Sequence, residues 1–115
     1  MYSMKPRIDA YLKHIRDAIA AVEQYAQGHT CKHFLRTPWD QAAVVRHLEI
    51  IGEAAVQVPT DYKSDHPEIP WRRISDFRNV LIHEYFAVDP LLIWEILEKD
   101  ISELKEKIEK LLEEA

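Results

Sequence analysis

The 115-residue sequence has little of three things: it contains two glycines, one cysteine and no long uninterrupted apolar run. Tight turns that need glycine are therefore few. The lone Cys31 excludes an intramolecular disulfide and is compatible with a reducing cytosol. No apolar run approaches the roughly 18–20 residues that span a bilayer, and the N-terminus lacks the apolar core of a signal peptide. These absences predict a cytoplasmic protein that does not insert into a membrane.

The sequence does have the composition of a folded, helical domain. Hydrophobic residues make up 47% and charged residues 30%, which is the balance of a globular protein. The length suits one core, so we predict a single domain over residues 1–115. Apolar residues recur at steps of three and four rather than in alternation, which predicts an all-α fold.

The first half of the chain predicts two long helices with a short turn between them. A disordered lead over residues 1–4 precedes the first helix, and Gly28 follows it as a stop. Thr30 is placed to cap the short turn. Thr37 and Pro38 offer an N-cap oxygen and a proline at the first helical position of the second helix. The apolar stripe of the first helix is Ile8, Leu12, Ile15, Ile19, Val22 and Ala26.

The second half predicts two more long helices after a proline-bracketed loop that could hold one helical turn. Pro70 fits the first position of the third helix, and Asp89 with Pro90 begins the last.

Gly52, in the middle of the second helix, costs about 1 kcal/mol relative to alanine and indicates a close helix approach. Together the four helices predict an antiparallel up-and-down bundle. The last helix carries an unbroken heptad seam of Trp94, Leu97, Ile101, Leu104, Ile108 and Leu111.

The formal charge of −5 is unevenly distributed. Eight acidic residues and four lysines from Leu91 onward give −4, which leaves −1 for the first ninety residues. A surface that binds a polyanion must therefore be local and lie away from the C-terminal helix. Tryptophans 39, 71 and 94 all stand near predicted helix starts, where we expect core anchors rather than base-stacking platforms.

The candidate chemistry lies in the eight residues from Arg78 to Tyr85. Asn79 and His83 are four apart and so are neighbours on a helix. Arg78 and His83 are five apart, roughly 140° around the axis, so they converge only through a bent arginine, a distorted helix or a concave site. An arginine fork suits phosphate oxygens, and a histidine moves protons near neutral pH. Alternatively, Arg78 makes a surface ion pair, His83 is a helix-end histidine and Tyr85 is core.

This pattern suits metal-free cleavage of RNA. His83 would deprotonate a 2′-hydroxyl that attacks the adjacent phosphorus, while Arg78 stabilises the developing charge. The leaving oxygen also needs an acid, and the motif supplies a single histidine. A two-fold dimer would bring a second histidine and a second arginine to the same cleft.

The segment resembles the HEPN superfamily, whose signature is an arginine, a polar residue, a short apolar stretch and a histidine. More narrowly it is similar to the HepT toxins, with the signature Arg-x4-His-x-Tyr, and Arg78, Asn79, His83 and Tyr85 match all four positions. The likeness extends over nearly the whole chain, including residues 48–55, 66–71 and 80–86. One departure is Phe77, where a methionine is expected.

The resemblance implies a metal-independent endoribonuclease that needs no cofactor, with Arg78, Asn79 and His83 as catalytic residues in a cleft shared by a homodimer. It also implies the toxin of a type II toxin-antitoxin system, with RNA as substrate, tRNA and mRNA being the candidates. The expected partner is a minimal nucleotidyltransferase antitoxin. That partner neutralises the toxin by binding, by transfer of AMP to Tyr85, or by both, since AMP adds bulk and negative charge beside Arg78.

Two groups of basic residues offer a weaker track for RNA. Arg72 and Arg73 precede the motif, whereas Lys32 and Arg36 follow the first helix. Ordinary surface charge explains Lys32 and Arg36 equally well.

Five further residues have no assigned role in the predicted site. His29, Cys31 and His33 alternate as in some zinc sites, but no fourth ligand has a familiar spacing, so we predict no metal. Arg46 and His47 interrupt the apolar seam of the second helix and face either the cleft or solvent.

A different class of function is open on the same residues. The chain could be a non-catalytic helical subunit that binds nucleotide or serves as a scaffold for a nucleotidyltransferase. This alternative predicts partner binding without RNA turnover, so an RNA-cleavage assay separates the two.

Overall fold

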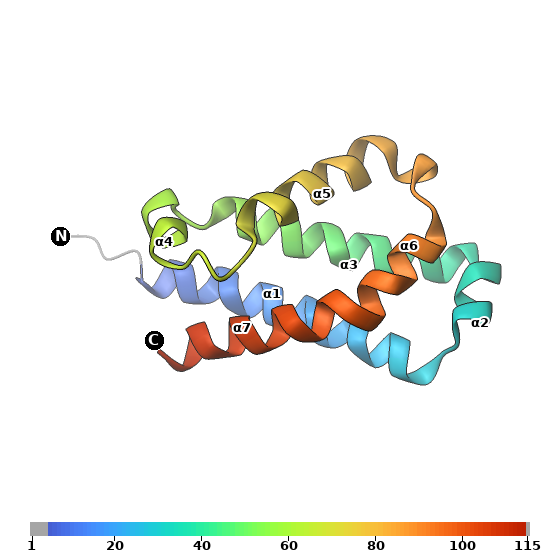
Figure 1. Ribbon diagram of the computed structural model, residues 1–115, viewed down its shortest axis with the longest axis horizontal. Coiled ribbons are helices and arrows are strands. Elements are labelled where there is room, and N and C mark those ends of the chain that lie inside the picture. Colours follow the sequence, from blue (N-terminus) through green and yellow to red (C-terminus); the bar gives the residue numbers. More distant parts are fainter. Residues whose placement is uncertain (1–4, 115) are drawn as a thin grey trace.

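Four long helical segments lie side by side and alternate in direction in the computed structural model of the chain (Figure 1). It describes residues 5–114, apart from the side chains of Lys5 and Tyr85, so the predicted lead over residues 1–4 lies outside the described part. The long segments are α1 (Lys5–Gly28), α3 (Pro38–Gln57), α5 (Trp71–Glu84), and the continuous α6 (Pro90–Glu95), π turn η2 (Ile96–Asp100) and α7 (Ile101–Glu113). The short elements are α2 (Cys31–Arg36), α4 (Thr60–Asp65) and the 3₁₀ turn η1 (Tyr85–Ala87).

The bundle is organised around α1 and α3. Helix α3 packs against both α1 and α5, and α1 also packs against α7. The predicted stripe of α1 forms much of the core, with Leu12, Ile15, Ile19 and Val22 almost fully buried. The all-α fold is therefore confirmed, and residues 5–114 contain no strand. Within the same range, no helix is both long and apolar enough to cross a membrane.

The helix starts follow the sequence signals, with two local differences. The Thr30 side chain accepts a hydrogen bond from the His33 amide at 3.1 Å, which caps α2 as predicted. Thr37 makes no such bond for α3, because its hydroxyl donates to the His33 carbonyl oxygen at 2.6 Å. The prediction that the Thr37 side chain caps α3 was therefore wrong, although Pro38 does begin α3. Pro70 lies one residue earlier than expected, just before α5, where its carbonyl accepts from the Ile74 amide at 3.0 Å.

The Thr30 cap gives a matched pair of variants. Replacing a capping threonine with alanine costs about 1 kcal/mol, so Thr30→Ala should lower the free energy of unfolding by about that amount. Thr60→Ala changes an exposed threonine at the first position of α4 and should have a smaller effect. Urea unfolding followed by circular dichroism compares the two. Equal losses would contradict a capping role for Thr30.

The last helix and one tryptophan differ from prediction. The seam from Trp94 to Leu111 is buried or half-buried as expected, but it is interrupted by the π turn at Ile96–Asp100 rather than running as one α-helix. Trp94 and Trp71 are buried, whereas Trp39 is 84% exposed. The prediction of a core anchor was therefore wrong for Trp39, which lies in the first turn of α3 and points to solvent there.

Candidate active site

Gly52 brings α3 against α5 at the position of Arg78. A Cβ built on Gly52 would collide with the Cβ of Arg78 and would lie 2.6 Å from its Cγ and 3.5 Å from its Cα. These are the atoms nearest the α5 backbone, so a flexible side-chain tip cannot simply move aside. The close approach that a mid-helix glycine predicted is confirmed, and it occurs at the candidate catalytic arginine.

The Arg78 side chain reaches a hollow of about 410 Å³ between α1, α3 and α5. The Arg78 Nε is buried and makes no hydrogen bond with a described residue, while its Nη1 donates to the Asn79 Oδ1 at 2.9 Å. The guanidinium is thus positioned mainly by packing and keeps donors for a ligand. The hollow is lined by Tyr11, His14, Ile50, Glu53, Ala54, Val56, Gln57 and Arg78.

His83 is exposed in the last turn of α5 and is not among the residues that line the hollow. Helix α5 stays α-helical through Glu84, and the tighter η1 turn begins only at Tyr85. No helix irregularity lies between Arg78 and His83, so the two remain roughly 140° apart around the axis. A single chain therefore does not gather the two side chains in one hollow.

Asn79 and Tyr85 complete the sequence motif. Asn79 is exposed beside Arg78 and accepts its hydrogen bond. Tyr85 is the first residue of η1, immediately after α5 ends, and its side chain lies outside the described part of the chain. The α-helix on which Tyr85 would share the Arg78 face therefore does not extend to it.

The weaker basic candidates lie apart from the motif. Arg72 and Arg73 are exposed in the first turn of α5, six and five residues before Arg78, which is roughly 8–9 Å along a helix, and neither lines the hollow beside Arg78. The Arg72 Nε lies 4.0 Å from the Asp76 Oδ2, so the two side chains form an exposed ion pair. Lys32 and Arg36 are exposed on α2, which packs against α3 and α6. The structure thus gathers neither pair around Arg78.

Arg46 and His47 have local partners on α3. Arg46 donates hydrogen bonds to Glu53 at 3.0 Å and to Glu49 at 3.3 Å. These bonds, the one to Glu53 first, raise the pKa of Arg46 above its ordinary value. The His47 Nδ1 lies 2.8 Å from the Ala43 carbonyl oxygen. Glu53 also lines the hollow, so Arg46 is linked to that hollow through a carboxylate.

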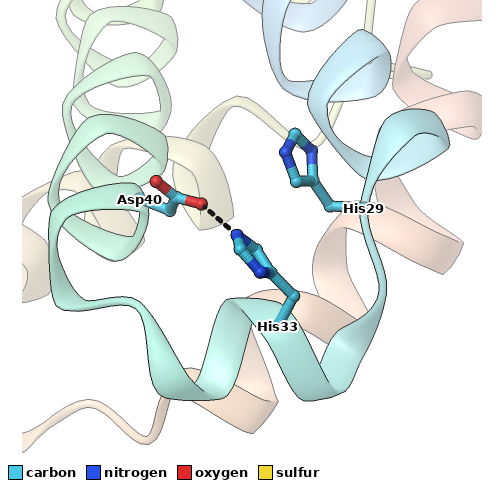
Figure 2. A group of neighbouring side chains, drawn as sticks. All are labelled: His29, His33 and Asp40. Atoms are coloured by element: carbon cyan, nitrogen blue, oxygen red, sulfur yellow. Dashed lines mark hydrogen bonds and ion pairs between the residues drawn. The ribbon is translucent and has the colours of Figure 1, made fainter.

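His29 and His33 lie close to Asp40, a residue that was not part of the predicted histidine–cysteine pattern. Figure 2 shows His29, His33 and Asp40 converging at the corner between α1, α2 and α3. Among the described residues, Cys31 is not part of this group. The Tyr25 hydroxyl donates to Asp40, and that bond, with smaller effects from His33 and His29, lowers the pKa of the Asp40 carboxyl. Burial, then the Asp40 carboxylate, raises the pKa of Tyr25.

Sequence reasoning missed Tyr11, His14 and Glu53 around Arg78, and Asp40 beside the histidines. Tyr11 and His14 are three apart, so one helical face could have been recognised. Nothing local relates that face to an arginine more than sixty residues further along the chain.

The chain belongs to the HepT-like ribonuclease family of the HEPN superfamily. The family described as "Ribonuclease HepT-like" matches residues 15–111, which include all of α3 and α5 and the whole motif.

Individual relatives agree with this assignment. The chain is 44% identical to "Probable ribonuclease HepT" of Thermococcus cleftensis, over 94% of this chain and 98% of the relative. It is 40% identical to a protein of Methanocaldococcus jannaschii named "Gamma-glutamylcyclotransferase and putative RNase", over 96% of this chain and 50% of the relative. The chain therefore spans about half the length of that relative. A "Putative RNase" of Caldanaerobacter subterraneus is 37% identical over 90% of this chain and 92% of its own length. No solved structure matches.

Proposed function

We propose that this protein is the toxin of a type II toxin-antitoxin pair, a metal-independent endoribonuclease whose active site combines Arg78, Asn79 and His83 from two copies of the chain. The observation that carries the proposal is the placement of Arg78. The Cβ and Cγ of Arg78 pack against Gly52, its Nε is buried without a described protein partner, and its side chain lines a hollow, while His83 is exposed five residues further along the same helix.

The proposed reaction uses one base, one acid and one fixed cation. His83 removes the proton from a ribose 2′-hydroxyl, whose oxygen attacks the adjacent phosphorus. The P–O5′ bond breaks, which gives a 2′,3′-cyclic phosphate and a 5′-hydroxyl end. A protonated imidazole, the partner subunit's His83, supplies the proton to the leaving 5′-oxygen. Arg78 binds the non-bridging oxygens and stabilises their charge in the transition state.

Two features of the single chain support a two-fold dimer with this division of roles. Within one chain Arg78 faces the α1–α3–α5 hollow and His83 does not. Exposed apolar side chains occur within the motif and just after it in the sequence, on α5, η1 and α6, and Phe86 is 80% exposed. Clusters of exposed apolar residues mark protein interfaces, and a two-fold contact here would place both motifs next to each other. The exposed apolar residues in this region are Val80, Ile82, Phe86, Leu91 and Leu92.

An RNA-cleavage assay with purified protein in excess EDTA tests the activity. We expect cleavage products that carry a cyclic phosphate, which acid opens and which phosphatase alone does not remove. Absence of cleavage from a panel of tRNA and mRNA substrates, together with tight binding of a nucleotidyltransferase, would instead favour the scaffold function.

Modification of Tyr85 is the proposed means of inactivation by the antitoxin. Tyr85 follows directly after α5, two residues beyond His83. AMP attached to its hydroxyl adds a negative charge that competes for Arg78 and repels RNA phosphate.

Incubation with the partner nucleotidyltransferase and ATP should therefore raise the intact mass in steps of one AMP and abolish cleavage. The Tyr85→Phe variant should keep its mass and stay active under the same treatment, and Tyr62→Phe is a matched control on α4. An unchanged mass with full inhibition would show that the antitoxin acts by binding alone.

A further inference from the structure

The corner between α1, α2 and α3 holds a group of side chains that the proposed cleavage does not use. We call His29, His33 and Asp40 the corner cluster (Figure 2). Each residue offers one ligand atom, and these three atoms all lie within 4.8 Å of one another. His33 Nε2 is 3.0 Å from Asp40 Oδ2. The residues come from the segment after α1, from α2 and from the first turn of α3, so their proximity depends on two changes of chain direction.

Two members of the cluster, His29 and Asp40, are each oriented by a second contact. The His29 Nδ1 lies 2.9 Å from the Tyr25 carbonyl oxygen, and the tautomer that donates this bond leaves Nε2 with a free lone pair. The His29 ring also stacks on Tyr25, with ring centroids 4.1 Å apart. The Tyr25 hydroxyl donates to Asp40 Oδ2 at 2.6 Å. Outer contacts of this kind, to a backbone carbonyl and to a carboxylate, are those that orient ligands in metal sites.

The backbone of the corner is fixed independently of these side chains. Thr30 accepts from the His33 amide at 3.1 Å, and the Thr37 hydroxyl donates to the His33 carbonyl at 2.6 Å. The Gln41 side chain donates to the Phe34 carbonyl at 2.9 Å. These bonds tie α2 to the start of α3 and hold His33 opposite Asp40. A simple His33–Asp40 ion pair would need no third ligand, whereas His29 is directed to the same place.

We propose that His29, His33 and Asp40 bind one divalent transition-metal ion of the zinc type, at the corner where α1, α2 and α3 meet. Two imidazoles and a carboxylate are a ligand set that Zn²⁺ accepts, with a water completing a tetrahedron. Tetrahedral ligands about 2.0–2.1 Å from zinc lie roughly 3.3 Å from one another, so the present spacing needs a small side-chain rotation. His29 and His33 are exposed, which leaves room for it and for entry of the ion.

Binding of Zn²⁺ to the chelator-treated full-length protein tests the site. Titration calorimetry should give one ion per chain with a dissociation constant in the micromolar range or below, and Zn²⁺ should raise the melting temperature. Substituting Co²⁺ should give visible absorption bands typical of tetrahedral coordination. His29→Ala and Asp40→Asn should each weaken binding at least tenfold, and circular dichroism will verify that both variants remain helical.

Two matched variants identify the ligands. Cys31→Ser should bind Zn²⁺ like the unmodified protein, because Cys31 is outside the cluster despite its position between the histidines. His47→Gln changes a histidine of α3 that contacts the Ala43 carbonyl and should also be neutral. The proposal is overturned if one-to-one binding is absent, or if binding persists in Asp40→Asn and is lost in Cys31→Ser. RNA cleavage in EDTA is a separate measurement, so failure of one proposal does not affect the other.

Discussion

Arg78→Ala and His83→Ala should each reduce RNA cleavage at least a hundredfold. Loss of a proton-transfer group typically costs 10²–10⁴ in rate, and loss of a transition-state donor about 10²–10³. His83 is exposed, so its removal should leave the fold intact. Arg78→Lys should also be poorly active, because an ammonium lacks the planar fork that grips two phosphate oxygens. Initial rates on a defined RNA, together with melting temperatures, provide the comparison.

Matched controls exist elsewhere in the chain. Arg16→Ala removes an exposed arginine of α1 that pairs with its neighbour Asp17, and His66→Ala removes a histidine from the connection before α5. Both should cleave RNA at close to the rate of the unmodified protein. Full activity in Arg78→Ala or His83→Ala would eliminate the proposed chemistry, whatever the family membership.

Mixed dimers test whether two copies share one cleft. If both histidines are needed together, an equal mixture of unmodified and His83→Ala subunits should retain about one quarter of the activity after random pairing. If each chain acts alone, the mixture should retain about half. The two values are far enough apart for a simple rate measurement to decide between them.

Gly52→Ala should impair cleavage although Gly52 itself contacts no RNA in the proposed mechanism, because the added methyl group displaces Arg78. Carbon atoms in ordinary contact are about 3.5–4 Å apart, so the added methyl group must push α5 away from α3 by roughly 1 Å. Misplacement of that size can cost about 10²-fold in rate, and we expect at least a tenfold loss. The gain of about 1 kcal/mol in helix propensity is outweighed by about 1–3 kcal/mol of overpacking. Unfolding should therefore occur at a lower urea concentration.

Gly28 is the natural control for this prediction. An added Cβ at Gly28 meets nothing within 4 Å, and neither glycine has a positive φ. Gly28→Ala should keep full activity and be neutral or slightly stabilising. A Gly52→Ala protein that is fully folded at the assay temperature and cleaves RNA normally would show that Arg78 does not depend on the close helix approach.

Much of the fold follows from local patterns, because their causes are local. The stripe on α1 predicts its buried face, Pro38 and Asp89 mark helix starts that are present, and Gly52 predicts a close contact. The residue that makes this contact could not be predicted, since the register between α3 and α5 depends on packing across the whole bundle. The same limit applies to Trp39, which is exposed although it lies in the first turn of a helix that packs into the bundle.

The site is less predictable than the fold. The sequence motif singles out Arg78 and His83. Their angular separation around the helix axis could be known only from the structure, in which α5 stays regular through Glu84. Tyr11 and His14 line the same hollow as Arg78 only because α1 lies against α3. Asp40 meets His29 and His33 because the chain turns twice within ten residues. The last two arrangements bring together residues from different helices, and the spacing of residues in the sequence does not predict them.

The π turn at Ile96–Asp100 changes the direction in which the later side chains of the last helix point. A π turn adds one residue to a helical turn, which rotates everything beyond it by about 100° relative to an uninterrupted α-helix. Before the π turn, α6 packs against α2, and the ring centroids of Trp94 and Phe34 are 5.6 Å apart. Beyond the π turn, α7 packs against α1. One continuous helix thereby contacts two neighbours, α2 through α6 and α1 through α7. It links α2, which carries His33, to the helix against which α3 packs.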